Sequence, residues 1–130
     1  MYGYKYGSVD YNKDITDIRG MIFTSVRQNG DFILFENDEW LVEIGHHQDC
    51  CEDVYIESLV GDLYDLINTP ILVADERTCN YDPPNGRNPV SYSWTFYCFA
   101  SVKGYVDIRW FGSSNGYYGE RANVYFYRKE

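Results

Sequence analysis

Residues 46–52 read His-His-Gln-Asp-Cys-Cys-Glu, so seven neighbouring positions hold imidazole, thiol and carboxylate groups. Together these groups suit zinc. On an extended backbone alternate side chains share a face, which would place His47 with Asp49 and His46 with Glu52. Side chains two positions apart on a strand stand about 7 Å apart, too far for three to close on one ion without a bend. Structural zinc sites also use two separated ligand pairs. We therefore expect no metal and no other cofactor.

The same segment offers a cysteine nucleophile activated by histidine. A reactive thiolate needs nearby positive charge, whereas Asp49, Glu52 and Asp53 are negative. Negative neighbours raise the pKa of a thiol and lower its reactivity. The structural alternative has the cysteines buried as small apolar side chains, with a histidine and Asp49 bonded to backbone groups. We expect no catalytic residue and no enzymatic activity.

Negative charge is concentrated in the middle of the chain. Residues 28–76 contain thirteen carboxylates and no lysine or arginine, while residues 1–27 carry a net charge of +1 and residues 77–130 a net charge of +3. The formal total is −9. Binding to duplex nucleic acid depends on cations that displace counterions, so a duplex is not an expected partner. A protein with a basic surface is electrostatically compatible with the acidic segment.

Tyrosine is the second notable feature of the composition. Aromatic residues make up 18% of the chain, and fourteen of them are tyrosines. Rigid rings beside small polar residues are typical of binding surfaces. The stretch after Arg109 has this composition, and the candidate binding residues there are Arg109, Trp110, Asn115, Tyr117 and Tyr118. The alternative is a hairpin whose rings pack on the sheet.

Turn residues divide the chain into strands. Asn29-Gly30 between two apolar runs predicts a β-hairpin, and Asp62 before residues at helical spacing predicts the N-cap of a short helix that ends at Thr69-Pro70. The expected strands are residues 21–28, 31–36 and 40–44 in a first meander, 92–102, 105–111 and 122–127 in a second, and 54–59 and 71–74 between them. Residues 80–89 are expected to be a loop and residues 14–19 one helical turn. This pattern predicts a single α+β domain over residues 1–130, mostly antiparallel β-sheet with one short helix. Residues 1–14 are a flexible tail or an edge strand.

Cellular setting and thiol state follow from the same sequence. The N-terminus lacks an apolar run behind a basic start, and the longest apolar stretches are too short to cross a bilayer. We therefore expect a cytoplasmic protein without a membrane partner. In that setting the four cysteines are expected to be free thiols, with Cys79 and Cys98 as one candidate pair if oxidation occurs.

The 46–52 motif, Val54-Tyr55-Ile56-Glu57, Gly61-Asp62-Leu63, residues 104–110 and residues 114–118 resemble a family of small uncharacterised bacteriophage proteins carrying a His-x-Gln-Asp-Cys-Cys-Glu motif. The resemblance covers roughly residues 20–127. It implies a phage origin and the cytoplasm of an infected bacterium, but no reaction and no residue roles. Small acidic phage proteins without enzymatic motifs resemble antagonists of bacterial immunity, including anti-CRISPR proteins and sponges for nucleotide signals.

Three functions are compatible with these observations. The first is a non-enzymatic inhibitor that binds a basic host defence protein through the acidic segment. The second is a sponge for a nucleotide-derived immune signal, with rings that stack a base and with Arg109, His46 or His47 on phosphate or ribose. The third is a metal- or thiol-dependent hydrolase built on residues 46–52. An isologous homodimer fits the exposed strands and many rings, although nothing in the sequence specifies one.

Overall fold

The computed structural model describes residues 6–48, 51–79, 81–86, 89–116 and 119–129. In these residues nine strands form two antiparallel sheets. The five-stranded sheet has the order β1 (Tyr6–Val9), β9 (Asn123–Lys129), β4 (Trp40–Gly45), β3 (Phe32–Glu36) and β2 (Ser25–Asn29). The four-stranded sheet has the order β5 (Asp53–Val60), β8 (Gly104–Ser114), β7 (Ser91–Ser101) and β6 (Val73–Cys79).

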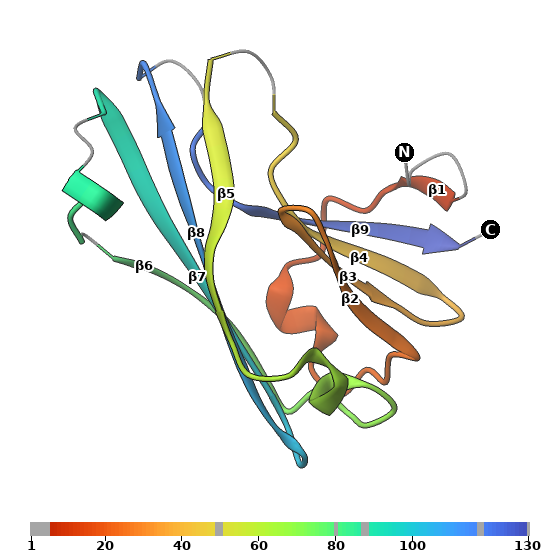
Figure 1. Ribbon diagram of the computed structural model, residues 1–130. Coiled ribbons are helices and arrows are strands. Elements are labelled where there is room, and N and C mark those ends of the chain that lie inside the picture. The colour runs from red at the N-terminus through yellow and green to blue at the C-terminus, as the bar shows by residue number, and fades with distance from the viewer. Residues whose placement is uncertain (1–5, 49–50, 80, 87–88, 117–118, 130) are drawn as a thin grey trace.

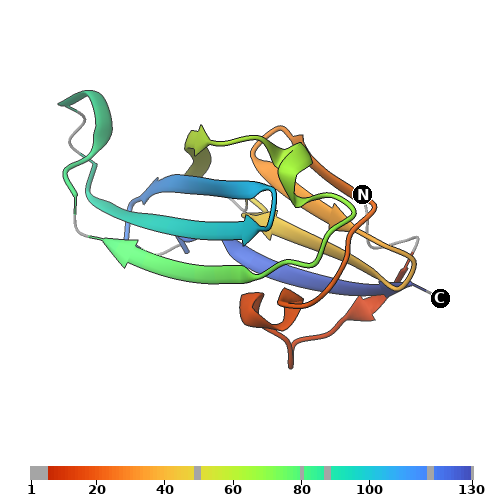
Figure 2. The ribbon, with the colours of Figure 1, turned by 90° about the horizontal axis from the view of Figure 1, so that it is seen from below.

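The two sheets pack face to face, with their strands crossing rather than aligned (Figure 1; Figure 2). Alternation places one side of each strand in the core between them. Phe35 of the five-stranded sheet meets Phe99 of the four-stranded sheet with ring centroids 5.0 Å apart. Tyr97 and Trp110 pack edge to face at 5.5 Å in the same core. One apolar core therefore joins the two sheets.

The predicted hairpin is confirmed, but its turn lies one residue later than the predicted Asn29-Gly30. Asn29 pairs with Phe32, so Gly30 and Asp31 form the two-residue turn, in which Gly30 has a φ of 61°. Only glycine adopts this left-handed conformation without a steric cost, and the turn twists in the direction of the flanking strands. The hairpin fixes the register that sends Val26, Ile33 and Phe35 into the core.

The helical part of the α+β prediction is corrected. Asp62 is an N-cap, as expected, and its side chain accepts a hydrogen bond from the Tyr64 amide, but the element that follows is a 3₁₀ helix, η3 (Leu63–Leu66). The other helical pieces among the described residues are also 3₁₀ helices, η2 (Ile15–Ile18) and η4 (Pro84–Gly86). Asn68, with a φ of 60°, and Pro70 end the helical stretch before an α-helix can form. The fold is antiparallel β with 3₁₀ turns.

The last strand belongs to the other sheet. The sequence predicted residues 122–127 as the third strand of the second meander, but β9 pairs with β4 and β1 in the five-stranded sheet. The edge of β8 that it would have needed is taken by β5. β1 adds an edge strand beyond β9, so part of residues 1–14 follows the edge-strand alternative. Within the described part of the chain, no helix is long and apolar enough to cross a membrane.

Candidate functional site

The side chains of His46 and Glu52 contact each other across the connection between β4 and β5. His46 Nε2 lies 2.7 Å from Glu52 Oε2, and His46 Nδ1 lies 3.1 Å from the carbonyl oxygen of Arg121. The two side chains are only 10% and 2% exposed. Because both ring nitrogens are engaged and both side chains are covered, this pair ties the 46–52 segment to the chain before β9. It offers no open position to a ligand.

His47 points to the opposite side, as alternation predicts. Its Nε2 lies 2.7 Å from Oε1 of Glu43, whose side chain is 2% exposed. The imidazole sits between the rings of Phe32 and Tyr125, with both centroids 5.0 Å away. Glu43 also lies near the hydroxyl of Tyr127. Burial is the largest cause that raises the pKa of Tyr127 to about 12, and the charge of Glu43 is the next. The two adjacent histidines therefore contact two different buried carboxylates, those of Glu52 and Glu43.

Two hypotheses for residues 46–52, a metal site and a thiolate nucleophile, can be compared with the structure. Among the described residues, no group of three His, Cys, Asp or Glu side chains could hold a metal ion, and Asp49 and Cys50 lie outside the described residues. Cys51 is disulfide-bonded, which corrects the expectation of free thiols there. A bonded sulfur cannot be a thiolate nucleophile.

The candidate pair Cys79–Cys98 does not form, because Cys98 is a free thiol. The register of β6 and β7 gives the reason. Cys79 lies opposite Trp94, whereas Cys98 lies opposite Asp75, four residues away on each strand.

The second predicted binding stretch divides between two sides of a sheet. Trp110 is fully buried in the core, where its indole nitrogen donates to the carbonyl oxygen of Asp31 at 2.9 Å. This position does not fit the predicted role in binding. Arg109 lies on the outer face of the same strand, and Asn115 is exposed just beyond it. Tyr117 and Tyr118 lie outside the described residues.

Folding places arginines and a lysine from the flanks beside carboxylates of the acidic segment. The ion pairs run between residues far apart in the sequence as well as across hairpins: Arg19–Asp75, Arg27–Glu36, Lys129–Glu36, Arg128–Glu39, Arg109–Glu57 and Arg121–Glu76. The paired carboxylates lie in or beside strands of both sheets. The acidic segment is thus partly neutralised by cations from both flanks.

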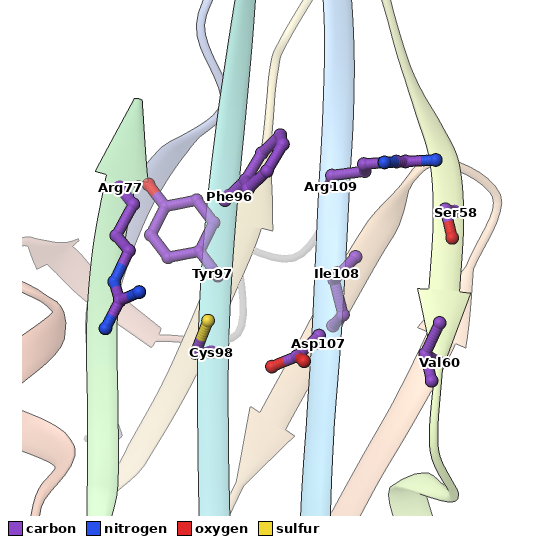
Figure 3. A pocket seen from close by; sticks show the side chains of 9 residues that line it. All are labelled: Ser58, Val60, Arg77, Phe96, Tyr97, Cys98, Asp107, Ile108 and Arg109. Atoms are coloured by element: carbon purple, nitrogen blue, oxygen red, sulfur yellow. The ribbon is translucent and has the colours of Figure 1, made fainter. Parts of the chain in front are cut away.

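A cavity of about 390 Å³ lies on the outer face of the four-stranded sheet. Ser58, Arg109, Phe96 and Arg77 form one row across its four strands, in that order. Figure 3 shows the Arg77 and Arg109 side chains on either side of Phe96. Two cations thus flank one aromatic ring over the cavity.

The next row along the strands carries the opposite charge. Val60 pairs with Asp107, Asp107 with Cys98, and Cys98 with Asp75. Burial, followed by a hydrogen bond with Asp107 and its charge, raises the pKa of the Cys98 thiol. Cys98 is therefore a neutral group on the cavity wall, beside a carboxylate that can accept hydrogen bonds.

The two arginines are held differently. Arg109 Nε lies 2.6 Å from Glu57 Oε1, and its guanidinium carbon lies 5.6 Å from the ring centroid of Trp94. Arg77 is exposed and makes no hydrogen bond or ion pair with any residue that the structure describes. The Arg109 guanidinium is thus held over a ring, and the Arg77 side chain is exposed to solvent.

Aromatic rings extend from the cavity toward one end of the face. Trp94 packs against Phe96 and Phe111, with centroids 6.2 and 4.9 Å apart, and Tyr81 packs against Phe96 at 5.9 Å. The Trp94 indole nitrogen also donates to the Tyr81 carbonyl oxygen at 3.2 Å. These contacts fix the position of the Phe96 ring between the arginines.

Of the predicted site residues that the structure describes, only Arg109 lines this cavity; Arg77, Phe96 and Asp107 were missed. The expected strand at 71–74 stopped before Arg77, whereas β6 continues to Cys79. Alternation of Phe96 and Cys98 with the core residues Tyr97 and Phe99 was the available signal. This alternation was not evident in the sequence, because large side chains occur on both sides of β7.

Comparison with known proteins gives one family. The model of a family described as a domain of unknown function (DUF7448) matches residues 11–124. Neither the curated proteins nor the solved structures gave a match.

Proposed function

The chain belongs to this family of domains of unknown function, and we propose that it is a non-enzymatic protein that binds a small anionic ligand with a flat ring. The observation that carries the proposal is the row of Arg77, Phe96 and Arg109 over the cavity of the four-stranded sheet. The ligand would lie on this face, with its ring near Phe96 and its anionic group on Arg77.

The chemistry of the row suits a nucleotide-derived molecule. A guanidinium can bind a phosphate with two parallel hydrogen bonds, and aromatic side chains stack on bases of any sequence. Asp107 adds an acceptor for an amino or hydroxyl group of the ligand. A volume of about 390 Å³ lies within the usual range for small-molecule sites. These features favour the sponge for a nucleotide-derived immune signal over the other predicted functions.

The inhibitor that docks through an acidic surface stays a prediction with weaker support. Ion pairs with Arg19, Arg109, Arg121 and other flanking cations reduce the field of the acidic segment. The phage origin and the anti-defence setting rest on the sequence resemblance alone. A thiol hydrolase using Cys51 would require its disulfide to be reduced first.

The test is calorimetric titration of the whole protein with cyclic mononucleotides, cyclic dinucleotides and adenine dinucleotides. We expect one class to bind, and Arg77→Ala to weaken its binding about 10- to 100-fold, because a hydrogen bond to a charged group contributes about 1.5–3 kcal/mol. Arg109→Ala should weaken it as well.

Arg128→Ala is the matched control. It removes the same charge from the five-stranded sheet, where Arg128 lies 3.7 Å from Glu39, and should leave the affinity unchanged. Absence of binding by every nucleotide, or equal losses in Arg77→Ala and Arg128→Ala, would contradict the proposal.

A further inference from the structure

The outer face of the four-stranded sheet has a charge pattern that is complementary to itself. β6 carries Asp75 and Arg77, and β8 carries Asp107 and Arg109, each pair two residues apart on the same side. Strand register places the two arginines in one cross-strand row, through Phe96, and the two aspartates in the adjacent row, through Cys98. A positive row therefore runs beside a negative row. Arg109 also pairs with Glu57 and Asp75 with Arg19 in the same chain, whereas Arg77 and Asp107 form no ion pair among the described residues.

The same face leaves large apolar side chains open to solvent. Val60, Val73 and Tyr105 are 52%, 39% and 60% exposed. Val60 lies in the aspartate row, and Val73 and Tyr105 lie in the next row, further from the arginines. At the opposite end Tyr92 is 39% exposed and stacks on Phe111. These exposed apolar side chains lie beside the charge rows, and a partner that covered the rows would cover them as well.

We propose that a second copy of this chain covers this face in an isologous dimer. In this dimer a two-fold axis runs between the two rows and parallel to them. Rotation about this axis places the arginine row of one copy over the aspartate row of the other. Arg109 then faces Asp107 of the partner subunit, and Arg77 faces Asp75 of the partner subunit. Because the axis exchanges the two ends as well, Tyr105 faces the aromatic end of the other copy.

The area of the face is close to that of a standard interface. Four strands about 4.8 Å apart, with eight, eleven, eleven and seven residues at about 3.4 Å each, give roughly 600 Å² per copy. Stable protein interfaces bury about 800 Å² per partner. Projecting side chains increase the buried area above that of the flat sheet. This inference goes beyond the proposed ligand, because the charge rows and apolar ends are present without it.

The test is the mass of the ligand-free full-length protein, measured by sedimentation equilibrium over a range of concentrations. We expect a dimer that weakens as salt is raised. Asp107→Arg should be a monomer, because the introduced guanidinium would face Arg109 of the partner subunit. Arg77→Asp should be a monomer for the same reason, because the introduced carboxylate would face Asp75 of the partner subunit. Neither Asp107 nor Arg77 forms an ion pair among the described residues, so both variants should fold.

Two controls make the test specific to this register. Asp38→Arg makes the same charge change in the turn before β4 and should remain a dimer. Asp107→Arg mixed with Arg109→Asp should form a mixed dimer, since each new charge meets its opposite across the axis, whereas each variant alone should not dimerise. Thermal unfolding checks that each variant is folded.

A monomeric wild-type protein overturns the dimer, as does a dimer that survives both Asp107→Arg and Arg77→Asp. Failure of two folded variants to form the mixed dimer overturns it too. None of these results decides the ligand proposal, because Asp107→Arg keeps Arg77, Phe96 and Arg109. Ligand binding by that monomer, with reduced affinity, would separate the two conclusions.

Discussion

At the scale of single residues, burial decides what the charged and polar groups of residues 46–52 can do. His46 and His47 are neighbours in the sequence, yet their side chains are 10% and 53% exposed. Each imidazole meets a carboxylate that is almost completely covered. A buried carboxylate that lost one of its hydrogen-bond partners would destabilise the fold, so these histidines have a structural reason to be present.

Cys98 gives a pH-dependent prediction at this scale. The reactive form of cysteine is the thiolate, and burial with Asp107 raises the pKa of Cys98. We expect alkylation of Cys98 in the folded protein to be slow at neutral pH and to rise at a higher pH than in the urea-unfolded chain. The folded state favours the protonated thiol, so its contribution to stability is present below the unfolded pKa and is lost as pH rises through the folded pKa.

The measurement is mass spectrometry of the Cys98 peptide after iodoacetamide treatment across a pH series. Asp107→Asn should move the profile to lower pH, because it removes the second-largest source of the shift together with its charge. Coincident profiles for folded and unfolded protein would contradict this account.

At the scale of elements, the contact between β8 and the segment leading to β9 is unusually close. A Cβ at Gly112 would lie 1.9 Å from the backbone oxygen of Glu120. The Glu120 side chain accepts hydrogen bonds from Ser93 and Ser114, at 3.2 and 2.5 Å, so this segment is fixed on the sheet. Only glycine leaves room for the backbone here.

Gly112→Ala should therefore destabilise the protein by about 1–3 kcal/mol or more, which is the cost of inserting a carbon into a closely packed site. Gly119→Ala is the control, since among the described residues its Cβ would meet His46 Cε1 alone, at an ordinary 3.7 Å. Urea denaturation measures both. Equal stability of the two variants would mean that the segment moves aside without cost.

At the scale of the whole molecule, the two sheets depend on one core. Trp40 lies in the five-stranded sheet and Trp94 and Trp110 lie in the four-stranded sheet, so fluorescence reports on both. Phe99 is 1% exposed and contacts Phe35 across the core. Because neither sheet has another apolar partner of this size among the described residues, we expect them to unfold together.

Phe99→Ala should cost about 3–5 kcal/mol, as for other buried phenylalanines, and should lower a single transition seen equally by tryptophan fluorescence and far-ultraviolet circular dichroism. Val102→Ala, at a position 78% exposed, should change stability little. Two separate transitions in Phe99→Ala would show that the sheets are independent.

The sequence alone determined the local features: the hairpin at Gly30, the Asp62 cap and the alternation that separates His46 from His47. Each depends on residues within a few positions of one another, where backbone conformation and side-chain periodicity act directly. The sequence also predicted antiparallel β-structure and named Arg109 as a candidate. It did not show that β9 leaves the second meander, or that Arg77 and Phe96 lie beside Arg109.

Only the tertiary structure decided those arrangements, because strand order and ion pairing join residues distant in the chain. Lopsided charge along the sequence predicted one acidic surface. Folding brings Arg19 beside Asp75 and Arg121 beside Glu76, since opposite charges from separate segments meet where neighbouring elements pack. The cavity with its two charge rows exists only through the register of four strands, which local patterning does not specify.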